Sequence, residues 1–368
     1  MNETVKEKSV RSSNFELLRI LAMFLIVGMH IIGYSGIGKP ETYNNFSSTN
    51  KVWLYFFFPG GDIGNNIFFL LMGYFLISKE NQLFPDFKKI KKLITQVYFY
   101  ALLSLIIFGI CYCFHLFRPN MGTKEIILST ASLLMPVSSE AFWFITTYLF
   151  IYVFIFYIFS LLRPMGKNKY WMIVFALAFI NIARFTNTGR YNQFLYSIVP
   201  VLMGGGIRLY RKHFSITALV LFLLCIILLW VVEVGLIQKI NILSLQEDLK
   251  SHTIFLALCE LSRNTQLIIA VFIFLLFGQF RIKQSKTLNY IASCIFAVYL
   301  IHVSPLSTDL IFNDLFKVNE YYKSDGLLPI CFFGLLVSVF ALAIVLEFLR
   351  NCITNKIVNF VNKRKSYK

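Results

Sequence analysis

The first apolar segment of the chain, NFELLRILAMFLIVGMHIIGYSG, carries three ionisable side chains: Glu16, Arg19 and His30. An ionisable group in such a segment is costly to bury, so it usually faces a cavity or a polar partner. Arginine binds phosphate through a planar fork of donors, and a neutral imidazole accepts a proton near neutral pH. Arg19 could therefore hold an anionic substrate while His30 acts as a general base.

The spacing of Arg19 and His30 places both on one face of a helix. They are eleven residues apart, which is within about 20° of three full turns and separates them by about 16 Å along the axis. Glu16 precedes Arg19 by three residues on the same side, so we expect it to orient the guanidinium. The alternative is that Arg19 reaches the lipid headgroups along its aliphatic stem and that His30 is a hydrogen-bonded packing residue.

A second histidine, His302, lies about fourteen residues into a later apolar segment, much as His30 does in the first. We therefore expect the two imidazoles at a similar depth in the bilayer, with Tyr299 one turn before His302. The alternative is that YLIH is the aromatic end of a membrane helix with an interfacial histidine. Trp143, at the outer end of its own segment, is a candidate acceptor-lining residue with the same alternative.

Two further polar groups complete the candidate site. Three residues at the start of the second apolar segment are expected to line the approach of the acceptor, although polar residues there also cap a helix; they are Asp62, Asn65 and Asn66.

A basic segment follows, and its side chains are expected to bind phosphate. The alternative is that they anchor the chain to anionic lipid. These four are Lys88, Lys89, Lys91 and Lys92.

The composition is that of a helical membrane protein. Of the 368 residues, 57% are hydrophobic and only 14% are charged, against about 25% charged in soluble domains. The mean hydropathy is +0.68. Apolar runs reach the roughly 20 residues that a membrane-spanning helix needs, and the alternating pattern of an outer-membrane barrel is absent.

The seven cysteines have no metal-ligand spacing with histidines, so we expect neither a disulfide nor a metal site. The polar first residues predict that no cleavable signal is present.

The apolar windows predict an all-α bundle with about ten spans. We place them near 17–35, 62–78, 93–116, 142–162, 170–186, 194–209, 214–236, 264–280, 288–306 and 327–349, with a surface helix at 125–135. The predicted cytosolic segments hold 23 of the 35 lysines and arginines, and the predicted outer loops hold 11. This bias predicts that both termini are cytoplasmic. We expect a single domain over 1–368, including a cytosolic tail at 1–13 and a basic cytosolic tail at 351–368.

Several segments resemble the acyltransferase-3 family of membrane acyltransferases. An arginine, ten residues and a histidine in the first span are the hallmark of that family. NNIFFLLMGYFLISKE is similar to its second helix, FKKIKKLI to the following basic segment, FWFITTYLFIYVFIF to its fourth helix, and IASCIFAVYLIH to its near-terminal helix. The resemblance runs along almost the whole chain. The chain differs from the family in having lysines where arginine is frequent, and Met72 where serine is frequent.

The resemblance implies an enzyme that transfers an acyl group, commonly acetyl from acetyl-CoA, to hydroxyls of cell-surface, exo- or capsular polysaccharides or their lipid-linked precursors. We expect it in the cell membrane of a bacterium, with acetyl-CoA as substrate, no tightly bound cofactor and no nucleic acid partner. Arg19 and the four lysines would hold the CoA phosphates, and His30 or His302 would act on the acceptor hydroxyl. A covalent acyl-enzyme is an alternative route. A transporter or flippase of a lipid-linked glycan is the alternative function.

Overall fold

The computed structural model describes residues 12–37, 46–79, 82–117, 119, 121–139, 141–182, 193–210, 213–246, 249–320 and 326–366. These residues form helices and connecting segments, and none of them is in a strand. The longer helices are α1 (Ser13–Tyr34), α3 (Ser48–Phe57), α4 (Gly60–Leu76), α5 (Phe87–Cys113), α6 (Thr123–Leu134), α7 (Trp143–Leu162), α8 (Gly166–Ile182), α9 (Gln193–Tyr210), α10 (Ile216–Leu243), α11 (Leu249–Gln279), α12 (Lys286–His302) and α14 (Leu327–Ser366). Short helical turns complete the fold: η1 (Arg163–Met165), α13 (Ser307–Asp309), η2 (Leu310–Leu315) and η3 (Val318–Glu320).

The all-α prediction is confirmed, and one helix lies at each of the ten predicted segments. Helix α6 coincides with the predicted surface helix at 125–135. Two boundaries differ by several turns, because α11 begins at Leu249 rather than near 264, and α14 continues to Ser366 rather than ending near 349. An apolar window marks the part of a helix that suits lipid, whereas the backbone hydrogen bonds continue through polar turns that contain good helix formers.

The chain is a multi-pass membrane protein. Six described stretches are long and apolar enough to cross a bilayer: Ser13–Tyr34, Phe87–Cys113, Trp143–Ile180, Ile216–Leu243, Lys250–Gln279 and Leu327–Lys356. The pair Lys286–His302 and Ser307–Leu315, bent by 101°, would be a seventh. Ten crossings stay a prediction, because α4 has only 17 residues and the stretch from α7 to α8 counts as one. Within that stretch, Gly166 with φ +77° turns the chain between α7 and α8.

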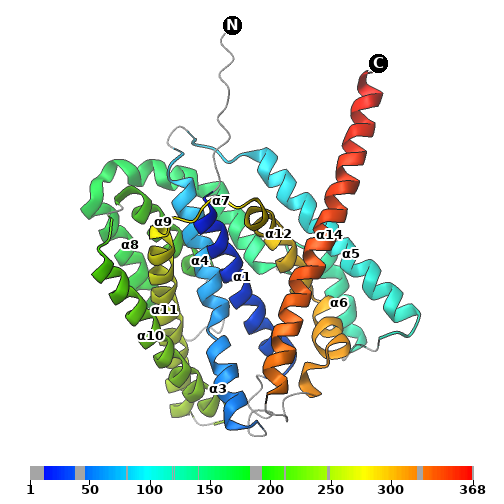
Figure 1. Cartoon of the computed structure of the whole chain (residues 1–368), viewed down its shortest axis with the longest axis horizontal. Helices are drawn as coiled ribbons and strands as arrows, with labels where there is room; N and C mark the ends of the chain where they lie inside the picture. The colour runs from blue at the N-terminus through cyan, green and yellow to red at the C-terminus, as the bar shows by residue number, and fades with distance from the viewer. Residues whose placement is uncertain are drawn as a thin grey trace.

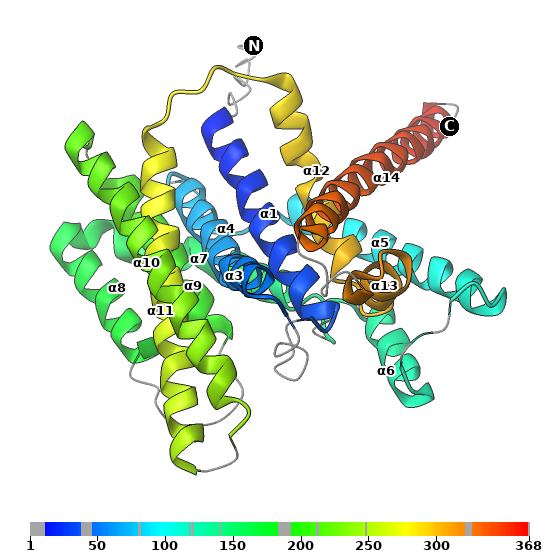
Figure 2. The same cartoon turned by 60° about the horizontal axis from the view of Figure 1, so that its bottom comes forward.

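Helices α1 and α4 occupy the middle of the bundle (Figure 1). Helix α4 packs on α1, α9 and α11, and α1 packs in turn on α12, which packs on α14. Figure 2 shows the two flanks, with α8, α9, α10 and α11 on one side of α1 and α5, α6, α12 and α14 on the other. Side chains on α1 can therefore meet residues from almost the end of the chain.

Polar contacts connect several helix ends on one side of the bundle. We call this side the basic end, and it comprises the start of α1 and the ends of α4, α9 and α11. Asn14 Nδ2 donates to Phe277 O over 2.9 Å, which joins the start of α1 to the end of α11. Arg208 Nη1 donates to Tyr74 OH over 3.0 Å, which joins the ends of α9 and α4. Helix α14 also ends on this side, as Figure 1 shows.

Helices α4 and α9 cross with their backbones almost touching. A Cβ added at Gly73 would lie 1.8 Å from Val201 O, and one added at Gly204 would lie 2.0 Å from Leu70 O. Any side chain at either glycine would collide with the facing backbone, as at other close helix crossings in membranes. These glycines thus hold α4 in place, and α4 forms one wall of the site described next.

Candidate active site

Two imidazoles meet where α1 and α12 pack against each other. His30 Nδ1 lies 2.9 Å from His302 Nε2, and the ring centroids are 5.1 Å apart. His302, the last residue of α12, is fully buried, while His30 is partly exposed. Both histidines are thus at one depth, as expected from their positions in the two segments, although 272 residues separate them in the chain.

The hydrogen bonds of this pair define the tautomer of each ring. His302 Nδ1 lies 2.6 Å from the carbonyl oxygen of Val298. A carbonyl can only accept, so His302 Nδ1 carries the proton and, in the neutral ring, His302 Nε2 is the acceptor. His30 Nδ1 must then donate to it, which leaves His30 Nε2 with a free lone pair. None of the described residues hydrogen-bonds to that nitrogen, so the geometry presents His30 Nε2 as a base.

Aromatic rings surround the histidine pair. The Tyr34 ring lies 5.0 Å from that of His30 and stacks on Phe312 from η2 at 5.8 Å. On the other side, the Tyr299 ring stands edge-on to His302 at 6.3 Å. These rings restrict the rotation of both imidazoles without using a further nitrogen of either ring.

A cavity of about 220 Å³, which we call the central cavity, leads from the basic end toward the histidine pair. Its walls come from α1, α4, α5, α7 and α12, and they are mostly apolar. Arg19 is the one charged residue in the lining, and Ile26 and Tyr299 line it too. Because Ile26 precedes His30 by four residues and Tyr299 precedes His302 by three, the cavity reaches to about one helical turn from the imidazoles.

Arg19 is held in place by two neighbours. Its Nη1 lies 2.5 Å from Glu16 Oε1, and Glu16 itself is buried. The guanidinium lies over the Phe75 ring, 5.4 Å from its centroid. The predicted contact between Glu16 and Arg19 is therefore present. Since about a third of the Arg19 side chain is exposed, its remaining donors can reach a ligand in the cavity.

The four lysines of the basic segment lie on the first turns of α5 and are all exposed. They are not equivalent, because Leu93 lines the central cavity and Lys89, four residues earlier, lies on the same helix face. Lys79, just after α4, is close enough to Lys89 for the two amines to interact electrostatically. Its burial, and secondly the charge of Lys89, lower the pKa of Lys79. Asp86 acts on the pKa of Lys79 in the opposite direction, so two amines and one carboxylate lie near one another and leave a net positive charge that attracts an anion. From the sequence alone, Lys79 was only one of the lysines between the predicted spans 62–78 and 93–116, and it was not a predicted site residue.

Three other predicted site residues make no hydrogen bond or ring contact with the imidazoles in the described part of the chain. Asp62 is close enough to Glu233 and Arg263 to interact with both electrostatically, so it belongs to a separate buried cluster. Asn66 is fully buried on α4, and in the described part of the chain its amide has no hydrogen-bond partner. Trp143 begins α7 and packs edge-on against Phe144.

Residues that the sequence did not single out complete the central cavity. Phe144, 5.7 Å from the Tyr299 ring, lines it together with Tyr148 and Ser293. No spacing pattern marks these side chains, because they come from helices whose contact depends on the packing of the whole bundle. Among the described residues, no three His, Cys, Asp or Glu side chains are arranged to hold a metal ion.

Comparison with family models matches residues 12–348 to an acyltransferase domain. The matched range covers both histidines, Arg19 and every helix that lines the central cavity. No curated protein and no solved structure matches the chain.

Proposed function

The chain belongs to the acyltransferase-3 family, and we propose that this membrane acyltransferase moves acetyl from cytosolic acetyl-CoA to a hydroxyl of a cell-surface polysaccharide or of its lipid-linked precursor. The observation that carries the proposal is the histidine pair, in which His30 Nε2 is free about one helical turn from a cavity that begins at an arginine.

The donor would enter from the basic end, which we take as cytosolic from the distribution of lysine and arginine. Arg19 and Lys89, with Lys79 beside it, would bind the phosphates of CoA through charge-assisted hydrogen bonds. The central cavity would take the pantetheine arm, because it is narrow, mostly apolar and aligned with α1. The roughly 16 Å between Arg19 and His30 along the helix suits an extended arm.

His30 Nε2 would then accept the proton of the acceptor hydroxyl while the hydroxyl oxygen attacks the thioester carbonyl. The tetrahedral intermediate would collapse by breaking the C–S bond, and the departing CoA sulfur would take the proton from His30. The products are the O-acetyl ester and CoA with a free thiol, so atoms and charges balance. His302 would act as a positioning residue, because its Nε2 keeps accepting from His30 Nδ1 in both protonation states.

The test is acetyl transfer by the purified protein in nanodiscs, with acetyl-CoA and polysaccharide isolated from cells that lack the gene. We expect CoA thiol to be released in equal amount with base-labile acetyl on the glycan. His30→Ala should abolish both products, whereas His252→Ala, a matched change of an exposed histidine on α11, should not. A transporter or flippase would release no CoA thiol, and its loss would change the amount of surface glycan rather than its ester content.

A further inference from the structure

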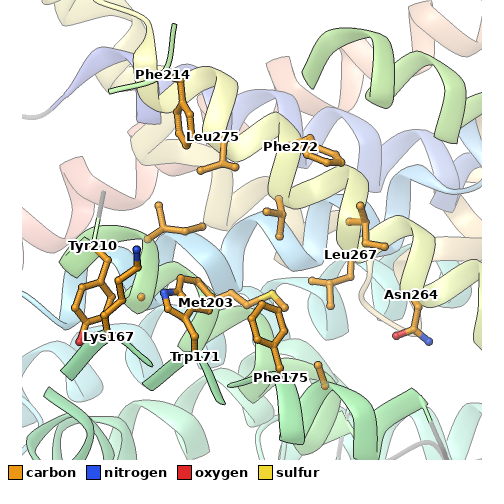
Figure 3. Close-up of a pocket in the computed structure, with 15 residues that line it drawn as sticks. Lys167, Trp171, Phe175, Met203, Tyr210, Phe214, Asn264, Leu267, Phe272 and Leu275 are labelled. Carbon is orange, nitrogen blue, oxygen red and sulfur yellow. The ribbon is translucent and has the colours of Figure 1, made fainter. Parts of the chain in front are cut away.

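A second and larger hollow lies on the flank formed by α8, α9 and α11, and we call it the side groove. Its volume is about 570 Å³, and it shares no lining residue with the central cavity. Figure 3 shows aromatic and aliphatic side chains along its length, among them Trp171, Phe175, Leu267 and Leu275. The acyl transfer proposed above makes no use of this space.

Polar groups lie only near the two ends of the side groove. Lys167, in the first turn of α8, and Tyr210, the last residue of α9, line one end, while Asn264 from α11 marks the other (Figure 3). Tyr210 and Arg208 share the last turn of α9, so the lysine lies at the basic end of the bundle. Lys167 is exposed and, within the described ranges, has no acidic partner.

The length of the side groove matches one leaflet of a bilayer. Lys167 and Ala178 bound it along α8, and Leu275 and Asn264 bound it along α11. Each pair is eleven residues apart, about 16 Å of helix, which is about half of the roughly 30 Å hydrocarbon thickness. The apolar lining stops at Asn264, whose amide donates to Glu260 O over 2.7 Å.

The side groove opens toward lipid rather than toward the interior of the bundle. Phe175 and Ile268 both line it, yet they are 59% and 47% exposed at the surface. An apolar slot that opens sideways can take a hydrocarbon chain directly from the membrane. A cation at its end then favours a chain whose headgroup carries negative charge.

We propose that the side groove binds one acyl chain of an anionic glycerophospholipid from the leaflet at the basic end, with the phosphate on Lys167. The bound chain lies against α9, which packs on α4 through Gly73 and Gly204. The lipid therefore supports the helix pair that forms one wall of the central cavity.

Quenching of Trp171 by brominated lipid tests this proposal. The protein in detergent is titrated with phosphatidylglycerol or phosphatidylcholine, each brominated in mid-chain, and the signal of Trp171→Phe is subtracted to isolate Trp171. We expect saturable quenching with half-saturation at an about fivefold lower concentration of phosphatidylglycerol, since one lysine near an anionic headgroup contributes about that factor. Lys167→Gln should remove the preference, and Lys169→Gln, on the same turn but outside the lining, should retain it.

Equal quenching by the two lipids in the wild-type protein would overturn the proposal, as would quenching that never saturates. Displacement of phosphatidylglycerol by a polyisoprenyl phosphate at much lower concentration would also overturn it, because the occupant would then be a longer carrier lipid. The readout is binding at Trp171, so its failure leaves the acyl transfer proposal unaffected.

Discussion

Two polar clusters inside the bundle connect helices that are distant in sequence, and they differ in the hydrogen-bonding groups that they leave unused. In the first, His30 of α1 meets His302 of α12, and one imidazole nitrogen remains without a partner among the described residues. In the second, Glu347 of α14 accepts from Gln96 and Tyr100 of α5 and forms an ion pair with Arg350 at 2.6 Å.

Both carboxylate oxygens of Glu347 accept hydrogen bonds in the second cluster, which we call the carboxylate cluster. Glu347 Oε2 accepts from three donors, Arg350 Nη2 donates to Oε1, and both charged side chains are more than 90% buried. A closed network of this kind holds two helices in register but offers nothing to a substrate. The histidine pair keeps one acceptor, His30 Nε2, without a hydrogen bond from any described residue about one helical turn from a cavity. This nitrogen is therefore available to accept a proton from a substrate.

The largest expected effect is on turnover at the histidine pair. His30→Ala should lower kcat by about 10²–10⁴-fold, because it removes the general base. The thermal unfolding temperature should fall only modestly, because a small apolar residue suits that helix and the cost is the one hydrogen bond that His302 Nε2 loses. Acetyl transfer and thermal unfolding of the same nanodisc sample measure the two. Wild-type turnover in a folded His30→Ala protein would show that another residue is the base.

The carboxylate cluster should show the opposite behaviour. Glu347→Ala leaves Arg350 buried without its partner, which should cost about 3–5 kcal/mol of stability, while kcat per folded molecule stays near the wild-type value. The double variant Glu347→Leu with Arg350→Met should recover most of the loss, because well-packed apolar side chains can replace a buried ion pair. Thermal unfolding of the three proteins measures this, and a Glu347→Ala protein as stable as the wild type would contradict the comparison.

His302 tests whether the two histidines have different roles. His302→Ala should lower kcat by about 10–100-fold, less than His30→Ala, because the base remains and only its orientation and tautomer are lost. The pH dependence of kcat should change as well, which loss of packing alone would not produce. Equal losses for the two variants, with an unchanged pH profile, would make His302 a structural residue.

The smallest expected effect separates the lysines of the basic segment. Lys89→Gln should raise the KM for acetyl-CoA a few-fold, and the effect should fade at high salt because exposed charges are screened. Lys88→Gln is the matched control, since it lies away from the helix face that carries Leu93. Equal effects of the two changes would indicate a diffuse attraction to the membrane surface rather than a phosphate site.

The sequence by itself determined the elements and their chemistry. Long apolar runs require helices in a bilayer, because lipid offers no hydrogen bond to an open backbone, and helices lie at all ten segments. The shared face of Arg19 and His30 follows from helical periodicity alone. Because such arguments use only neighbours along the chain, they apply before any packing is known.

The tertiary structure alone decided which of these residues act together. The distance from His30 to His302 and the placement of Asp62 beside Glu233 rather than beside the histidines depend on how α1, α4, α10 and α12 pack. The side groove depends likewise on α8, α9 and α11. Contacts between helices arise from side-chain shape over the whole bundle, and a residue's position in its own helix does not encode which helix lies opposite.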